Sequence, residues 1–301
     1  MGADEQHRMI ETAVAAMPNI LEQKDKSTTG ASAAASPTKG KGRSGGDGEE
    51  GEEVITASPE LLARLWAQLA ESALSHSMLK WAQHCCASCT AAIPEDALGR
   101  ADITKAGWRW FAVGNCVWGS TVEMLIAPAL QEESVQTSLR EKAIVYYNAA
   151  IRCAALASSW PTAQTAACKL WNCALPLLVT FEGRIRLEGS IKSALMEMSQ
   201  ISRSRGAETD ADLSASTQDV RVVLAMYKLL AQSLQEQGRL SEALRIVTDA
   251  TKRIPAELDN DATGGARLLD IRIMILASMN QDVRQDLGKK KASNNPRLKA
   301  Q

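Results

Sequence analysis

The chain has 301 residues, a formal net charge of −1 and a pI of about 6.4, so it offers nucleic acid no global positive field. Seven Trp accompany only three Tyr and two Phe. A core must therefore consist mainly of aliphatic residues, Met and Cys, which favours closely packed helices over a β-sandwich. No uncharged apolar run approaches the ~18 residues that a membrane helix needs.

Residues 1–57 predict a short helix followed by a disordered linker. A weakly amphipathic stretch over 5–22 is interrupted by Pro18. Residues 24–53 consist of Ser, Ala, Gly and charged residues, with no large apolar side chain to bury, so we expect them to be disordered. Asp4 and Glu5 stand where a secretory or transit peptide is basic, so we expect the protein in the cytosol or its connected compartments.

A helical domain is predicted over 58–283. It opens at Ser58, Pro59 and Glu60, which provide an N-cap, a first-turn proline and an acidic first turn. Ser138 and Glu141 form a capping box that predicts another helix start. Beyond the two hairpins described below, a helix is predicted from Asp102 or Thr104 to 127, and further helices over 139–157, 162–180, 184–202 and 266–279. We expect residues 284–301 to form a basic, flexible tail.

Two stretches of this domain repeat each other, Ala63–Pro94 and Leu224–Pro255. Large, small and terminating residues recur in one register. The matched pairs are Trp66 with Tyr227, Leu69 with Leu230, Ala70 with Ala231, Leu79 with Leu240, Ala82 with Ala243, Cys86 with Val247, Cys89 with Ala250, and Pro94 with Pro255. This agreement indicates two copies of one helix hairpin.

The spacing predicts two closely packed antiparallel helices in each copy. Small residues let the backbones approach, and the ring of Trp66 or Tyr227 fills the gap along the first helix. Ser77 and Gly238 stand at the turn, where a residue tolerant of left-handed backbone is favoured, and a proline closes each copy. We therefore expect an all-α fold, an α-solenoid of antiparallel helix pairs.

These hairpins are identified as members of the tetratricopeptide-repeat (TPR) superfamily. A second likeness lies between Ala112–Leu130 and Ala166–Leu178, and it superposes Trp118 on Trp171. The segments WFAVGNCVWG and AACKLWNCALPLL, set between TPR-like pairs, resemble the large cilia- and flagella-associated TPR proteins of the axonemal central apparatus. The resemblance implies a structural role that supports motility, with other central-apparatus subunits as partners and no catalysis.

The residues themselves give little support to an enzyme or a metal site. His84, Cys85, Cys86 and Cys89 form the only cluster that suggests a metal site, but the sequence has no second pair of ligands to complete it. We therefore interpret the three cysteines as core residues. Three histidines and no phosphate-binding loop leave little for catalysis. We therefore predict no enzymatic activity, no cofactor and no metal.

Two further expectations concern partners. The basic tail is suited to attract the acidic tails of tubulin; the simpler interpretation is a solvated terminus, and we expect no nucleic acid as a ligand. Its basic residues from position 289 onward are Lys289, Lys290, Lys291, Arg297 and Lys299. The alternative to an axonemal scaffold is a soluble cytosolic TPR adaptor, which would hold a peptide segment of its partner in a concave groove.

Overall fold

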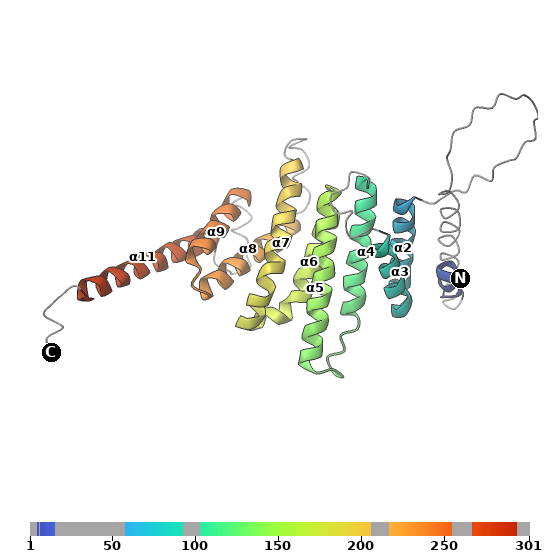
Figure 1. Cartoon of the computed structure of the whole chain (residues 1–301), viewed down its shortest axis with the longest axis horizontal. Coiled ribbons are helices and arrows are strands. Elements are labelled where there is room, and N and C mark those ends of the chain that lie inside the picture. The colour runs from blue at the N-terminus through green and yellow to red at the C-terminus, as the bar shows by residue number, and fades with distance from the viewer. Residues whose placement is uncertain are drawn as a thin grey trace, which may run out of the picture. The chain divides into compact units, whose positions relative to one another are not determined.

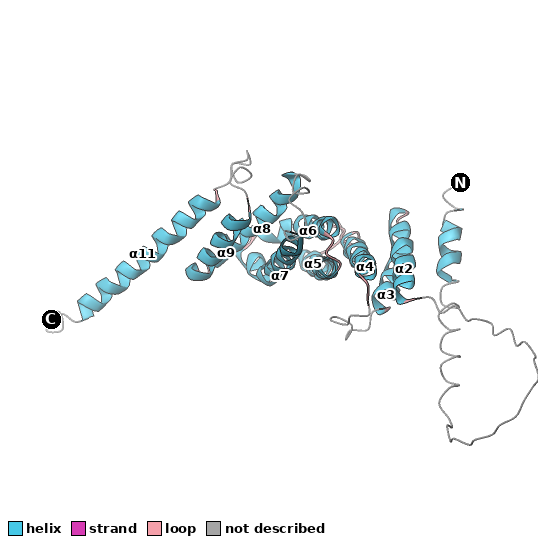
Figure 2. Ribbon diagram, turned by 90° about the horizontal axis from the view of Figure 1, so that it is seen from above, coloured by secondary structure: helices cyan, strands magenta, loops and turns pink. Residues whose placement is uncertain are grey.

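The computed structural model describes residues 5, 7–15, 58–92, 103–205, 217–254 and 267–293. Every extended regular element in these ranges is a helix, as the sequence predicts (Figures 1 and 2). None of the described helices is long and apolar enough to span a membrane. The chain divides into two compact units, Met1–Thr121 and Val122–Gln301, and each is described separately.

Unit 1 is built around a helix hairpin. The hairpin consists of α2 (Pro59–Ser75) and α3 (Leu79–Ala91), and α4 (Lys105–Glu123) follows it and ends just beyond the unit boundary. The predicted helix start is confirmed, because the Ser58 side chain accepts a hydrogen bond of 3.2 Å from the backbone N–H of Leu61. The N-terminal helical segment 7–15 buries Ile10 and Val14.

Close packing in unit 1 depends on small residues of three helices. A Cβ atom placed on Gly114 of α4 would lie 2.6 Å from Sγ of Cys89 in α3 and 4.0 Å from Cβ of Ala67 in α2. Sγ of Cys89 also donates a weak hydrogen bond to the carbonyl oxygen of Ala63, at 3.5 Å. Since no space remains for even one methyl group, glycine sets the distance at which α4 packs.

Unit 2 is a row of helices that pack against their neighbours (Figure 2). Within it, α5 packs against α6 and α7, α7 against α8, α8 against α9, and α9 against α11. The elements are α5 (Glu133–Leu156), α6 (Trp160–Ala174), the 3-10 helix η2 (Leu175–Val179), α7 (Phe181–Arg205), α8 (Thr217–Glu236), α9 (Leu240–Arg253) and α11 (Leu268–Ser293).

Several helix bounds differ from those predicted. The capping box at Ser138 and Glu141 does not start a helix, because α5 already begins at Glu133 and runs through it. The segment predicted as one helix over 162–180 changes to a 3-10 helix at Leu175, next to Pro176, which has no N–H to continue the α-helical ladder. The last helix extends well beyond its predicted end at position 279, to Ser293.

Three helix hairpins of the described chain close with the same turn. Ser77, Ser158 and Gly238 have positive φ values of 59°, 53° and 74°. At each turn the N–H of this residue donates to the carbonyl three residues earlier, at 2.9–3.0 Å, and the next N–H donates to the carbonyl five residues before it, at 2.8–2.9 Å. This is the Schellman motif of helix C-termini. The predicted turns at Ser77 and Gly238 are confirmed, and the α5–α6 hairpin adds a third at Ser158.

The turn residues provide a matched set for testing the cost of left-handed backbone. We expect Ser77→Gly and Ser158→Gly each to raise the free energy of unfolding by about 0.5–1 kcal/mol, because glycine adopts positive φ without a Cβ clash. Gly238→Ser should lower it by a similar amount. Urea denaturation of the three variants measures these changes, and the same sign for all three would contradict the argument.

Gly114 and Gly189 form a second matched pair. Gly114→Ala should destabilise the protein by about 1–3 kcal/mol, since the added methyl group would overlap the Cys89 side chain. Gly189 lies within α7, and a Cβ atom added there would meet open space, so Gly189→Ala should stabilise by up to about 1 kcal/mol through helix propensity. Thermal unfolding compares the two; equal effects would show that α4 does not need glycine.

Candidate functional site

The three hairpins share more than their turns. Eleven residues before the turn residue each carries a ring, and the exposed fractions of Trp66, Tyr147 and Tyr227 are 2%, 0% and 4%. Five residues after the turn residue each carries an alanine with no exposed surface, and these are Ala82, Ala163 and Ala243. Large and tiny side chains therefore occupy equivalent buried places in all three copies.

The other residues predicted from the repeat lie in or beside these cores. Ala70, Leu230, Ala231 and Ala250 are buried, and Leu69 is half-buried. Pro94 and Pro255 lie outside the described residues.

Trp118 and Trp171 occupy different kinds of helix, although the sequence likeness superposes them. Trp118 is on α4, which follows a hairpin, whereas Trp171 is on α6, the second helix of one. Both indole rings are half-buried. The middle copy that the structure brings into register with the outer two runs through Tyr147, Ser158 and Ala163 instead.

The comparison of the two outer hairpins within this sequence did not reveal the middle copy. Its turn residue, Ser158, lies midway between Ser77 and Gly238 to within one position of the sequence. A search at half the offset between the outer copies would have found Tyr147 and Ala163. The match was obscured by Ile151, which fills the position that alanine takes in the outer copies, at Ala70 and Ala231.

The cysteine cluster lies in the core of unit 1. Cys85, Cys86 and Cys89 have no exposed surface, and none of the seven cysteines forms a disulfide. Burial raises the pKa of Cys85 to about 12 and also raises that of Cys86, so both thiols are protonated at neutral pH. Across the described residues, no group of three or more His, Cys, Asp or Glu side chains could hold a metal ion.

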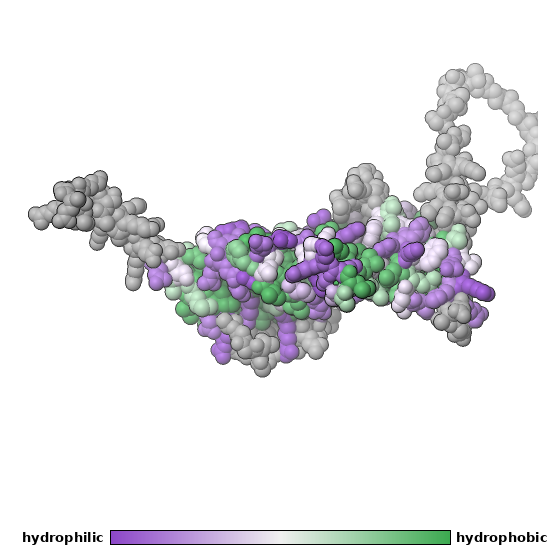
Figure 3. Space-filling model, turned by 90° about the horizontal axis from the view of Figure 1, so that it is seen from below, coloured by the Kyte–Doolittle hydropathy of each residue, from purple (hydrophilic) through white to green (hydrophobic). Residues whose placement is uncertain are grey.

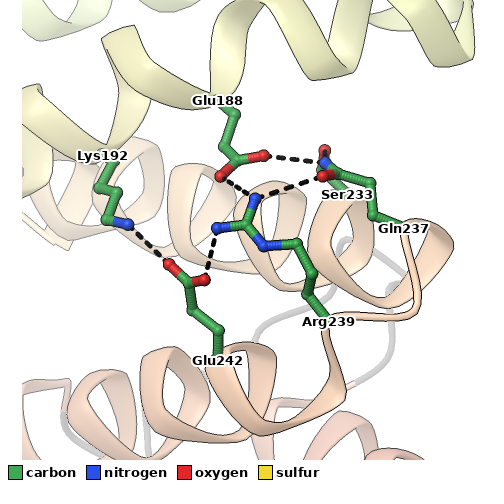
Figure 4. Close-up of polar contacts among 6 residues, drawn as sticks. All are labelled: Glu188, Lys192, Ser233, Gln237, Arg239 and Glu242. Carbon is green, nitrogen blue, oxygen red and sulfur yellow. Dashed lines mark hydrogen bonds and ion pairs between the residues drawn. The ribbon is translucent and has the colours of Figure 1, made fainter.

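The most developed polar cluster joins α7 to the third hairpin (Figure 4). Glu188 accepts from Nη1 of Arg239 at 2.7 Å through one oxygen and from Nε2 of Gln237 at 2.8 Å through the other. Glu242, at the start of α9, accepts from Nζ of Lys192 at 2.6 Å and also pairs with Arg239. We call Glu188, Lys192, Gln237, Arg239 and Glu242 the α7–turn network.

The α7–turn network connects α7 to the turn between α8 and α9. Glu188 and Lys192 are four residues apart and so share one face of α7, which places them opposite the turn that Gly238 allows. Hydrogen bonds from Lys192 and Arg239 lower the pKa of Glu242. Because these side chains keep contact with water, the network fixes the orientation of the hairpin more than it adds stability.

Hydrophobic side chains also reach the surface of unit 2 (Figure 3). One group, which we call the α6–α7 corner, comprises Leu175, Val179, Phe181 and Ile185, and Val179 is 80% exposed. Nη1 of Arg184 holds this corner by donating to the carbonyl oxygens of Leu178 and Val179, at 2.8 and 3.3 Å. The corner is therefore an apolar surface on a fixed backbone.

No protein-family model matches the chain, and no curated protein matches it. The functional proposal below therefore depends on the sequence pattern, the packing and the surface of the described residues.

The α7–turn network predicts a specific dependence of stability on pH. Because the pKa of Glu242 is lowered in the folded state, its contribution is present above its unfolded pKa, about 4.3, and is lost as the pH falls through the lower folded value. Glu242→Gln should therefore flatten the acid limb of the stability curve relative to the wild type. Glu182→Gln, which alters an 81% exposed partner of Arg186, is the control and should leave that limb unchanged. Thermal midpoints between pH 2 and 7 measure both.

Proposed function

We propose that this chain is a non-enzymatic helical-repeat scaffold that assembles other proteins. The observation that supports the proposal best is the recurrence of one hairpin, with the same turn, ring and alanine positions, at nearly equal offsets along the chain. Arrays of such units form α-solenoids, TPR proteins among them, whose extended surfaces bind other proteins.

The surface chemistry agrees with this role. Exposed apolar side chains close together in the sequence and held on a fixed backbone are suited to protein contacts. In the α6–α7 corner, Arg184 also donates from Nε to Glu236 of α8 at 2.9 Å, so the exposed Val179 and Phe181 stand on a braced turn. A partner would bury these side chains with little loss of conformational entropy.

We further propose that the scaffold belongs to the axonemal central apparatus of cilia and flagella. The support is the resemblance of the segments around Trp118 and Trp171 to TPR proteins of that assembly. In this proposal the partners are other central-apparatus subunits. Electrostatic attraction of the basic residues from Lys289 onward to the acidic tails of tubulin would add a salt-sensitive contact.

Localisation in ciliated cells tests the proposal. We expect a tagged full-length chain to enter motile axonemes and to remain there after extraction with non-ionic detergent. Val179→Glu should reduce that retention, because it places a charge in the centre of the α6–α7 corner. Met196→Glu changes an exposed apolar residue of α7 outside the corner and should leave retention unchanged.

The same experiment separates the alternatives. A chain that is washed out with the detergent, stays diffuse in the cytosol and binds a short peptide tightly would overturn the axonemal proposal in favour of the cytosolic adaptor. Equal loss of retention in the two Glu variants would show that the α6–α7 corner has no specific role.

A further inference from the structure

Helix α11 has two apolar faces, and the other described helices cover one of them. Leu268, Ile271 and Ile275 are buried, and α11 packs against α9 and α8. A second row of aliphatic residues is exposed. This row, which we call the α11 stripe, consists of Leu269, Ile273 and Leu276, with exposed fractions of 57%, 56% and 40%.

The α11 stripe is the beginning of a heptad pattern. Its residues are spaced by four and then three positions, and the same alternation continues along the sequence to Asn280, Val283 and Leu287. Since the backbone of α11 is helical as far as Ser293, all six positions belong to one seam of the helix. In heptad notation the d positions are Leu269, Leu276 and Val283, and the a positions are Ile273, Asn280 and Leu287.

We propose that α11 pairs with α11 of a second copy of this chain as a short, parallel, two-stranded coiled coil. Within the α11 stripe, Ile273 at a and leucine at both d positions is the combination that favours two strands over three or four. Asn280 occupies the central a position, where an asparagine can hydrogen-bond to its counterpart across the axis and so fixes a parallel dimer in register.

One pair of oppositely charged residues in the sequence beside the seam agrees with the parallel arrangement. Asp286 is at a g position and Lys291 at the following e position. In a parallel pair, g of one strand faces the next e of the other, so opposite charges would meet there. In an antiparallel pair centred on the seam, Asn280 would instead face Leu276, and its amide would lose its hydrogen-bonding partner.

The pairing is also favoured because part of α11 is already ordered as a helix by its packing within the chain. Three heptads are few for an isolated coiled coil, since short helices are marginal in water. Here the packing of Leu268, Ile271 and Ile275 already stabilises the first half of α11 as a helix. Association therefore has to order less backbone than two free peptides would. The inference goes beyond the proposed scaffold function and does not depend on it.

Sedimentation equilibrium of the purified full-length chain tests the pairing, with loading concentration varied. We expect a reversible monomer–dimer equilibrium. Ile273→Glu should raise the dissociation constant by about 30-fold or more, as the loss of a buried hot-spot residue does. Met274→Glu changes a neighbour that is 47% exposed but lies outside the seam, and it should leave the constant unchanged. A monomer at every concentration, or a dimer that withstands Ile273→Glu, would overturn the proposal.

Oxidative cross-linking tests the direction of the two strands. Leu269→Cys should form an intermolecular disulfide on mild oxidation, because in a parallel pair the two d positions lie side by side. Met274→Cys, outside the seam, should not. An antiparallel pair would place residue 269 opposite residue 287, so a dimer that fails to cross-link through Leu269→Cys would exclude the parallel register. Circular dichroism and the thermal midpoint of each variant confirm that it is folded.

Discussion

The whole arrangement depends on how closely two antiparallel helix backbones approach. Ala82, Ala163 and Ala243 have no exposed surface, and each stands five residues after a left-handed turn residue. A larger side chain at these positions would push the two helices apart. The ring of Trp66, Tyr147 or Tyr227 would then no longer fill the space between them. Burial of one large apolar side chain is worth about 1.5–3 kcal/mol, so the loss of close approach would weaken each hairpin by a substantial amount.

The sequence predicted the class of fold and the outer hairpins because their signals are local. A tolerant residue at the turn, a ring eleven residues before it and an alanine five residues after it all lie within one hairpin. The middle hairpin escaped because Ile151 replaces the small residue that stands at the equivalent position of the outer hairpins. The two indoles that the sequence comparison superposed, Trp118 and Trp171, lie outside this register.

The polar and apolar surfaces could not be read from the sequence, since they arise from residues brought together by packing. Glu188 and Arg239 are 51 positions apart and meet only because α7 lies against the third hairpin. The α6–α7 corner likewise depends on a 3-10 turn that was predicted as plain helix. The buried thiols, by contrast, could be predicted from the sequence, because the repeat register alone placed Cys86 and Cys89 in the core. Burial accounts for the raised pKa of Cys86.

The self-contained turns have a consequence for how the protein responds to tension. Each hairpin is closed by its own backbone hydrogen bonds between residues at most five positions apart, and its ring and its alanine belong to the same two helices. Such sequence-local contacts let one hairpin open and re-form without the others. Under a pulling load, the hairpins would unfold one after another, and each would refold when the load is released.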